Sequence, residues 1–173
     1  MKTLTFILIF TLGFTAFSQT EKDKQIMADA EVAKTTLMKE DPSIKTFFAN
    51  SAGYVIFPNV GKGGLIVGAA AGNGVLYVNN TEVGMAKLKK LSLGLQAGGQ
   101  SIIEAIFFED EKSLETFKKG NFQFAAGVSA VVLKSGKAKN AKYKDGVAVF
   151  AMPKAGLMAD ASVGGQKFDY HDF

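Results

Sequence analysis

Short apolar runs that end in glycine-containing turns are the feature of this sequence that most constrains its fold. Glycine supplies 19 of the 173 residues, and from Gly53 onward it repeatedly ends runs rich in Val, Ile, Phe and Tyr. Such runs are typical of β-strands joined by tight turns. The expected strands are 54–58, 64–71, 75–79, 91–100, 102–109, 122–133, 147–151, 156–163 and 166–170, with turns at 59–63, 72–74 and 79–80. Because most of these connections are too short for a crossover, the pattern predicts an antiparallel sheet.

Three segments carry helical features instead. In residues 21–40, apolar residues recur on one face from Ile26 to Leu37, and this narrow, alanine-rich stripe favours packing on the sheet over lying on a membrane surface. Asp41 and Pro42 end that helix and begin a second one, and residues 110–119 form a third. The sequence therefore predicts an α+β domain: an antiparallel, strongly curved sheet or partly closed β-barrel with N-terminal helices and one inserted helix.

Small residues lie at the centres of several expected strands, as in 68–71, 94–99 and 125–127. Glycine inside a strand marks a bend or the close approach of another backbone. Two interpretations stay open at this stage: close packing of a helix on the sheet, or a hollow left for an apolar ligand.

A weak internal repeat links two segments. Gly53–Phe57 is similar to Gly146–Phe150, and each is followed by a proline and then by a lysine, Lys62 or Lys154. The pattern predicts two related hairpins with these lysines at equivalent turns. Chance similarity between strands rich in glycine and valine is the alternative.

The first 18 residues have the layout of a secretory signal peptide. Lys2 gives a positive start, Leu4–Phe17 is almost purely apolar, and small residues precede the polar segment that begins at Gln19. The apolar run is shorter than the ~20 residues that span a bilayer as a helix. We expect export with cleavage after Ser18, a single domain over 19–173, and a periplasmic or extracellular location that includes association with a membrane. A permanent N-terminal anchor is the alternative.

Catalytic and metal-binding residue types are scarce in this chain. It has no cysteine and one histidine, His171, so disulfides, thiol ligands and histidine-assisted nucleophiles have little basis. The acidic residues 109–111 stand at the start of an expected helix, where the helix dipole favours them. Gly61–Gly64 lacks the spacing of a phosphate-binding loop. We therefore expect no enzyme, no cofactor and no metal site.

Lysine supplies all of the positive charge: the 20 basic residues are all lysine, and the formal net charge is +4. A lysine attracts phosphate as a point charge with little geometric selectivity. Two clusters of lysines, at 87–90 and 134–144, could contact anionic lipid headgroups, and so could the two lysines of the repeat. A solvated surface is the alternative. The candidates are Lys62, Lys87, Lys89, Lys90, Lys134, Lys137, Lys139, Lys142, Lys144 and Lys154. Export and the lack of aromatic stacking platforms argue against nucleic acid as a partner.

Three blocks of the sequence resemble the SYLF family. They are Ala52–Pro58 with Lys62–Gly68, then Leu91–Gln100, and then Gly156–Ala159, and they occur in the family's order. The resemblance implies lipid binding, with an anionic phospholipid or a fatty-acyl ligand as the partner. The chain departs from the family's pattern at 83–88, because it has no tryptophan there or elsewhere.

Two other function classes remain in view. One is a structural or protein-interaction module of the cell envelope that does not bind lipid. The other is a small outer-membrane barrel ending at Phe173, which the polar residues Lys167, Asp169 and His171 disfavour because apolar side chains would be needed at those positions. The expected function is therefore a non-enzymatic lipid-binding or membrane-surface protein.

Overall fold

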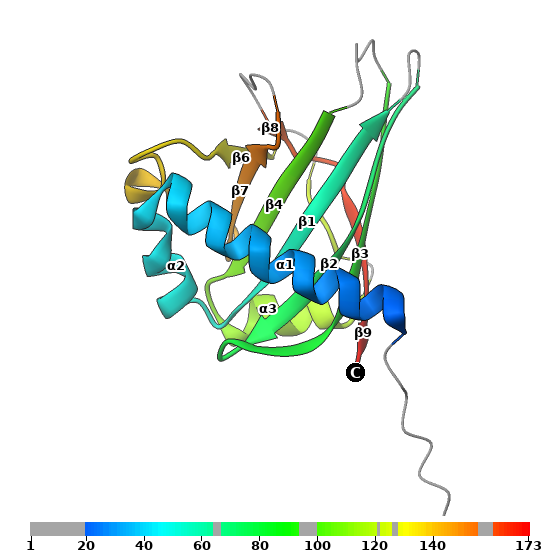
Figure 1. Cartoon of the computed structure of the whole chain (residues 1–173), viewed down its shortest axis with the longest axis horizontal. Coiled ribbons are helices and arrows are strands. Elements are labelled where there is room, and N and C mark those ends of the chain that lie inside the picture. The colour runs from blue at the N-terminus through cyan, green and yellow to red at the C-terminus, as the bar shows by residue number, and fades with distance from the viewer. Residues whose placement is uncertain (1–19, 64–66, 94–99, 121, 126–127, 156–160) are drawn as a thin grey trace, which may run out of the picture.

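The computed structural model describes residues 20–63, 67–93, 100–120, 122–125, 128–155 and 161–173. These residues form an α+β fold in which a strongly curved sheet is covered on its outer face by the N-terminal helices (Figure 1). The helical elements are α1 (Glu21–Glu40), η1 (Pro42–Ile44), α2 (Lys45–Asn50), α3 (Glu111–Lys118) and η2 (Ala138–Asn140). The strands are β1 (Gly53–Gly63), β2 (Val67–Val78), β3 (Thr81–Leu93), β4 (Gln100–Phe108), β5 (Phe122–Gln123), β6 (Ser129–Val132), β7 (Val147–Pro153), β8 (Ala161–Ser162) and β9 (Lys167–Asp172).

The sheet has the strand order β5-β9-β3-β2-β1-β4-β7-β6-β8. All of its described pairs are antiparallel except β6 with β7, which run parallel in the register Val131↔Phe150. The expectation of a purely antiparallel sheet is wrong at this one pair, because the connection through 133–146 is long enough to return the chain to the same end of the sheet. The expected α+β class with a strongly curved sheet is confirmed.

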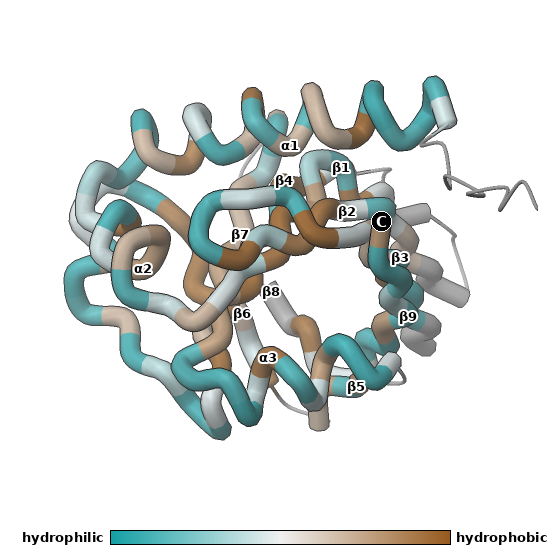
Figure 2. The backbone as a smooth tube through the Cα atoms, turned by 90° about the horizontal axis from the view of Figure 1, so that it is seen from below, coloured by the Kyte–Doolittle hydropathy of each residue, from teal (hydrophilic) through white to brown (hydrophobic). Residues whose placement is uncertain are grey.

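The two ends of the sheet order are brought together by the segments that follow β5 and precede β9. The Phe124 N–H donates to the Gln166 carbonyl at 3.1 Å, and the Val163 N–H donates to the Val128 carbonyl at 2.9 Å. The sheet therefore curls around an interior, as the view along it shows (Figure 2). In that view α1 lies outside β1 and β2, and α3 lies on the opposite side.

Strand alternation divides the buried side chains into two clusters. The inner cluster lies within the curved sheet and against α3, and it includes Val55, Phe57, Leu76, Ile106, Phe108, Leu114, Phe117, Val149 and Phe168. The outer cluster lies beneath α1 and α2, and it includes Leu37, Phe47, Phe48, Tyr54, Ile56, Tyr77, Phe107 and Phe150. Ala30, Ala33 and Leu37 of α1 are buried, which confirms that the narrow stripe of this helix packs on the sheet.

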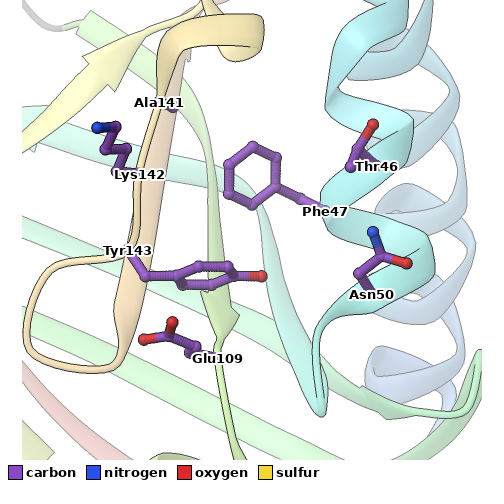
Figure 3. A pocket seen from close by; sticks show the side chains of 7 residues that line it. All are labelled: Thr46, Phe47, Asn50, Glu109, Ala141, Lys142 and Tyr143. Atoms are coloured by element: carbon purple, nitrogen blue, oxygen red, sulfur yellow. The ribbon is translucent and has the colours of Figure 1, made fainter.

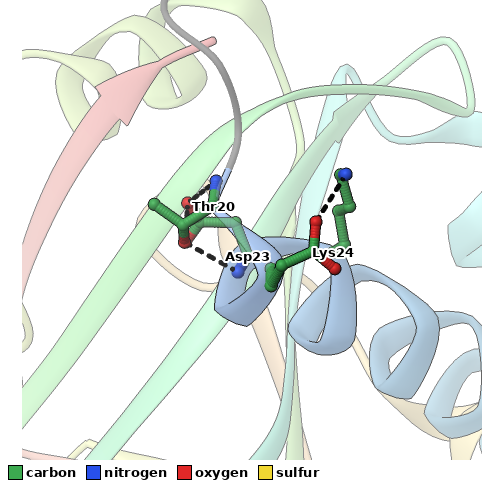
Figure 4. Close-up of polar contacts among 4 residues, drawn as sticks. Thr20, Asp23 and Lys24 are labelled. Carbon is green, nitrogen blue, oxygen red and sulfur yellow. Dashed lines mark hydrogen bonds and ion pairs between the residues drawn. The ribbon is translucent and has the colours of Figure 1, made fainter.

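Side-chain caps mark the start of α1 and the start of η1. Thr20 and Asp23 form a capping box, in which the Thr20 Oγ1 accepts from the Asp23 N–H at 3.2 Å and the Thr20 N–H donates to Asp23 Oδ2 at 3.0 Å (Figure 4). After the helix, Asp41 caps η1, as the sequence predicts: its Oδ1 accepts from the Ser43 N–H at 3.0 Å. The Asp41 Oδ2 also accepts from the Ala138 N–H at 2.7 Å, so this buried carboxylate ties the N-terminal helices to η2.

Two expected turns are wrong, because β1 and β2 continue through 59–63 and 72–74. A bulge between Phe57 and Val60 absorbs the proline of β1. At Gly74 a Cβ atom would lie 2.6 Å from the Ile56 carbonyl oxygen and from the Phe57 ring, so this glycine permits the close approach of β1 and does not make a turn. The turn at Asn79 and Asn80 is confirmed, and both residues have positive φ.

Other boundaries also differ from the expected ones. Residues 81–90, where the pattern predicts no strand, form most of β3. The single strand expected at 122–133 is two short strands, β5 and β6, because Phe124 and Val128, which lie between them, pair with residues 163–166. Most of the strand expected at 156–163, and the small-residue centre at 94–99, lie outside the described residues.

The repeated segments do not form two equivalent hairpins. β1 and β2 form a hairpin, but β7 pairs with β4 and β6 and not with a strand that follows it. Lys62 lies within β1, where its Cα is paired with Ala70 and Gln100, and so it is not at a turn. The two similar segments instead flank β4 on opposite sides, where Tyr54 and Ala148 both pair with Phe107.

None of the helices in the described part of the chain is both long and apolar enough to cross a membrane.

Candidate functional site

The candidate lysines do not form one patch; they occupy separate regions of the surface. Lys87 and Lys89 are exposed on the outer face of β3, whereas Lys90 is partly buried and falls on the inner face because side chains alternate along the strand. The exposed lysines around and after η2 are Lys134, Lys137, Lys139, Lys142 and Lys144, and Lys154 is exposed just after β7. The side chain of Lys62 lies outside the described set.

Lys87 and Lys89 line a groove of about 460 Å³ between the start of α1 and strands β1, β2 and β3. Lys22 of α1 also lines this groove, so three lysines border it. Asp29 of α1 lines it as well. The Lys89 Nζ also lies 3.2 Å from Asp169 Oδ2 in an exposed ion pair, which contributes little to stability in water. The sequence does not indicate that Lys22 lies near β3, because this proximity depends on how α1 crosses the sheet.

Lys154 lines a second groove, of about 390 Å³, between α1 and the ends of β4 and β7. Val32, which is 67% exposed, and Met152 contribute apolar surface to this groove. It contains one lysine and one aspartate, so its charge is balanced.

A cleft of about 450 Å³ opens in the wall of the sheet between β7 and the β5–β6 segment; we call it the wall cleft. Its apolar lining comes from Phe122, Phe124, Val128, Val131, Val147, Ala148 and Val149, and its polar lining from Gln123, Ser129, Lys142, Lys144 and Asp145. Phe124, Val147 and Val149 belong to the inner cluster. The wall cleft therefore leads from two lysines to the apolar interior.

The topology explains why the wall cleft exists. β6 pairs with β7 only at Val131↔Phe150 and Val132↔Ala151. Before β6, Val128 pairs with the segment between β8 and β9, where its carbonyl accepts from the N–H groups of Val163 and Gly164. Among the described strands, none consequently pairs with the first half of β7 on this side, where the only described partner is the bridge Lys144↔Val147.

The wall cleft suits an amphipathic ligand with an anionic group. Its volume is in the range of small-molecule sites, which are mostly apolar and carry a few polar groups that orient the ligand. Lys142 and Lys144 are both exposed, so their ammonium groups can attract an anion without a geometric requirement. Asp145, which also lines the wall cleft, partly offsets the positive charge of these two lysines. The apolar lining residues carry no distinguishing signal in the sequence, because they have the composition of ordinary core strands.

A second cavity, which we call the α2 pocket, lies on the other side of the 141–143 segment. It has a volume of about 430 Å³ and is lined by Thr46, Phe47, Asn50, Glu109, Lys142 and Tyr143, together with Ala141 (Figure 3). The ring centroids of Phe47 and Tyr143 lie 5.3 Å apart. Burial, with a further contribution from the charge of Glu109, raises the pKa of Tyr143 to about 12. The phenol is therefore neutral near pH 7.

Buried polar groups also occur inside the curved sheet. Glu104 and Gln166 are 0% and 1% exposed, and the Gln166 Nε2 donates to Glu104 Oε2 at 3.0 Å. His171 is exposed near the end of β9. Among the described residues, no group of three or more His, Cys, Asp or Glu side chains is arranged to hold a metal ion.

Two comparisons with known proteins bear on the identity of the chain. Residues 89–172 match the Ysc84 family, described as "Las17-binding protein actin regulator". The chain is also 30% identical over 154 residues to Beta cell expansion factor A of Aeromonas veronii, an alignment that covers 87% of this chain. The chain spans 58% of the length of that relative. These matches agree with the glycine-rich blocks described above: the chain belongs to the Ysc84 (SYLF) family.

Proposed function

We propose that this protein is a non-enzymatic lipid-binding module that docks on anionic phospholipid surfaces and takes an acyl chain into the wall cleft. The observation that carries the proposal is the wall cleft itself, in which Lys142 and Lys144 stand at one end of an apolar lining that reaches the inner cluster. A lipid presents the same two chemistries, an anionic headgroup and an apolar chain.

The lysines around η2 add electrostatic attraction to this site. Lys134, Lys137 and Lys139 are exposed on the same connection as the two cleft lysines. Each lysine near an anionic membrane contributes about 1 kcal/mol, and the contribution falls off within a Debye length. The hydrogen bond from the Ala138 N–H to Asp41 holds this connection against the N-terminal helices. The lysines therefore lie on a segment that is fixed to the rest of the fold.

The location of the protein is part of the same proposal. A signal peptide over residues 1–18 would place the domain in the periplasm or outside the cell, where it would meet phospholipid surfaces. Cleavage is tested directly by determining the N-terminal sequence of the protein secreted from its own cells.

Flotation with vesicles tests lipid binding. The purified protein is mixed with vesicles of phosphatidylglycerol or of phosphatidylcholine at several salt concentrations. We expect flotation with phosphatidylglycerol that weakens as salt rises, because the headgroup contact is electrostatic. Replacing both cleft lysines, Lys142→Gln with Lys144→Gln, should weaken binding roughly thirtyfold, from about 1 kcal/mol per lysine.

The matched control is Lys112→Gln with Lys119→Gln, which removes the same charge from two exposed lysines that do not line the wall cleft. Equal weakening in both double variants would show that only net charge matters. If the protein floats with no vesicle at any salt concentration, lipid docking is wrong. Binding of a fluorescent fatty acid that a bulky Val149→Trp substitution abolishes would locate the acyl chain in the wall cleft.

A second candidate is a protein-interaction module that does not use lipid. It is favoured by the description of the matching family, which names binding to a protein, Las17. Absence of lipid binding, together with a stable complex formed with a protein from the same cells, would support this candidate over the first.

A further inference from the structure

The α2 pocket has the composition of a site for an organic ammonium group. Aromatic rings attract cations through their negative faces, and a nearby carboxylate adds direct charge attraction. Phe47 and Tyr143 supply two rings tilted by 54°. Figure 3 shows the Glu109 carboxylate next to the Tyr143 ring and the Tyr143 hydroxyl directed toward α2. The pocket therefore offers a cation two aromatic side chains and an acid.

We propose that the α2 pocket binds the ammonium group of a zwitterionic phosphate ester, such as the headgroup of phosphatidylethanolamine, while Lys142 contacts its phosphate. The assignment of the lipid rests on the proposed function, whereas the ammonium site rests on the α2 pocket alone. The ligand class is an ammonium joined to a phosphate by a short linker. A membrane lipid and a free glycerophosphoamine are its two sources.

The polar residues of the pocket favour a primary ammonium over a quaternary one. A primary ammonium carries N–H donors that need acceptors when they leave water. Glu109, Thr46 and Asn50 line the pocket and supply carboxylate, hydroxyl and amide oxygens. A trimethylammonium has no such donors and would leave these oxygens without partners. We therefore expect ethanolamine esters to bind more tightly than choline esters.

Lys142 connects the two cavities, because it lines both the α2 pocket and the wall cleft. Glu109 and Lys142 are both exposed and both border the α2 pocket. Their opposite charges complement the ammonium and the phosphate of one headgroup. An acyl chain attached beyond the phosphate would then lie on the wall-cleft side of Lys142, so a single phospholipid would use both cavities.

The aromatic ring of Tyr143 is needed for this site, and its hydroxyl is not. The hydroxyl oxygen is buried and has no hydrogen-bond partner among the described residues, so it is not offered to a ligand in the pocket. Tyr143→Phe should retain ammonium binding because the ring remains. Tyr143→Leu should lose it while keeping apolar packing against Phe47.

The first arm of the experiment uses soluble ligands. Glycerophosphoethanolamine and glycerophosphocholine are titrated into the purified protein and followed by NMR chemical shifts. We expect saturable binding with ethanolamine preferred. Glu109→Gln should weaken it roughly fivefold, the effect of losing an exposed charge contact of about 1 kcal/mol. Glu111→Gln is the matched control, because Glu111 is exposed nearby in α3 and does not line the pocket.

The second arm uses vesicles with a constant phosphatidylglycerol fraction, in which the remaining lipid is phosphatidylethanolamine or phosphatidylcholine. Stronger binding to the phosphatidylethanolamine vesicles, lost in Glu109→Gln and kept in Glu111→Gln, identifies the membrane lipid as the source. Saturable binding of soluble ligand that is sensitive to Glu109→Gln, without a phosphatidylethanolamine effect in vesicles, identifies the free phosphoamine.

The ammonium site is wrong if neither arm responds to Glu109→Gln. Binding to phosphatidylglycerol vesicles would then survive unchanged, and the proposed function would stand. Conversely, loss of all vesicle binding with intact soluble-ligand binding would overturn lipid docking and leave the ammonium site in place.

Discussion

Replacing Asp41 should loosen the attachment of the lysine-rich connection and destabilise the whole fold. The carboxylate is 1% exposed. Its Oδ1 accepts from the N–H of Ser43 at 3.0 Å and from the Ser43 hydroxyl at 2.6 Å, and its Oδ2 accepts from the N–H of Ala138 at 2.7 Å. One side chain therefore serves as an N-cap and as a bridge between segments 97 residues apart in sequence.

The magnitude follows from what alanine would leave behind. Losing an N-cap costs about 1 kcal/mol. Leaving the Ala138 N–H unpaired in a site where that residue is 1% exposed costs about 1–3 kcal/mol more. We expect Asp41→Ala to lower the free energy of unfolding by about 2–4 kcal/mol at pH 7. Urea unfolding followed by circular dichroism measures this difference.

The destabilisation by Asp41→Ala should depend on pH in a defined direction. Burial alone would raise the pKa of Asp41, but hydrogen bonds from Ser43, Ala138 and Gly136 together hold it below its usual value of 3.8. A carboxyl whose folded-state pKa is depressed stabilises the fold above its unfolded-state pKa, and the stabilisation is lost as pH falls through the folded-state pKa. The difference in free energy of unfolding between wild type and Asp41→Ala should therefore become smaller as pH falls below about 4.

The control for this experiment is Glu40→Gln, an exposed neighbour whose loss removes the same charge. Hydrogen exchange at the Ala138 amide gives a local readout, because that N–H should exchange faster in Asp41→Ala. The reasoning is refuted if Asp41→Ala unfolds within about 0.5 kcal/mol of wild type at pH 7, the range of ordinary surface substitutions. A gap that stays constant from pH 7 to pH 3 would refute the electrostatic part alone.

Three further substitutions test how α1 and the sheet are packed. Lys34→Met should lower the free energy of unfolding in urea by about 1 kcal/mol. The Lys34 Nζ lies 2.7 Å from the Tyr54 hydroxyl, and 5.2 and 5.3 Å from the ring centroids of Tyr54 and Tyr77. A variant as stable as wild type would show that this ammonium does not anchor α1. Leu37→Ala should cost about 2–5 kcal/mol, because Leu37 is fully buried beneath α1, and a loss below about 1 kcal/mol would mean that α1 is not docked as described. Gly74→Ala should cost about 1–3 kcal/mol, since its Cβ would meet β1 at 2.6 Å. An unchanged melting temperature of Gly74→Ala would mean that the two strands can separate without cost.

The parts of the fold that depend on neighbours in sequence could be predicted from the sequence. Asp41 and Pro42 give both the end of α1 and the start of η1, since capping and the missing proline N–H are local effects. The turn at Asn79 and Asn80 is local as well. Gly72 and Gly74 suggest a turn, but glycine is needed there because β1 lies close by. Local sequence does not distinguish a glycine that makes a turn from one that permits a close approach.

The candidate site depends on contacts between distant segments, and this is why only half of it could be predicted. The lysines of the 134–144 connection stand out by charge alone. The apolar side of the wall cleft exists because the chain near Val128 pairs with Val163 and not with β7, which no local pattern encodes. Glu109 and Phe47 meet Tyr143 only through tertiary packing. Alternation at Lys87, Leu88 and Lys89 could have indicated β3 as a half-buried strand.

The pairing of β9 with β3 has a consequence for the order in which the chain can fold during synthesis. Gly84 of β3 pairs with Asp172 of β9, so this edge of β3 remains unpaired until β9 has left the ribosome. The hairpins β1–β2 and β2–β3 can form early, because their partners are close in sequence. Until β9 arrives, the nascent chain carries an unpaired strand edge of the kind that promotes aggregation. Truncations that remove β9 should therefore yield aggregates instead of a smaller folded domain.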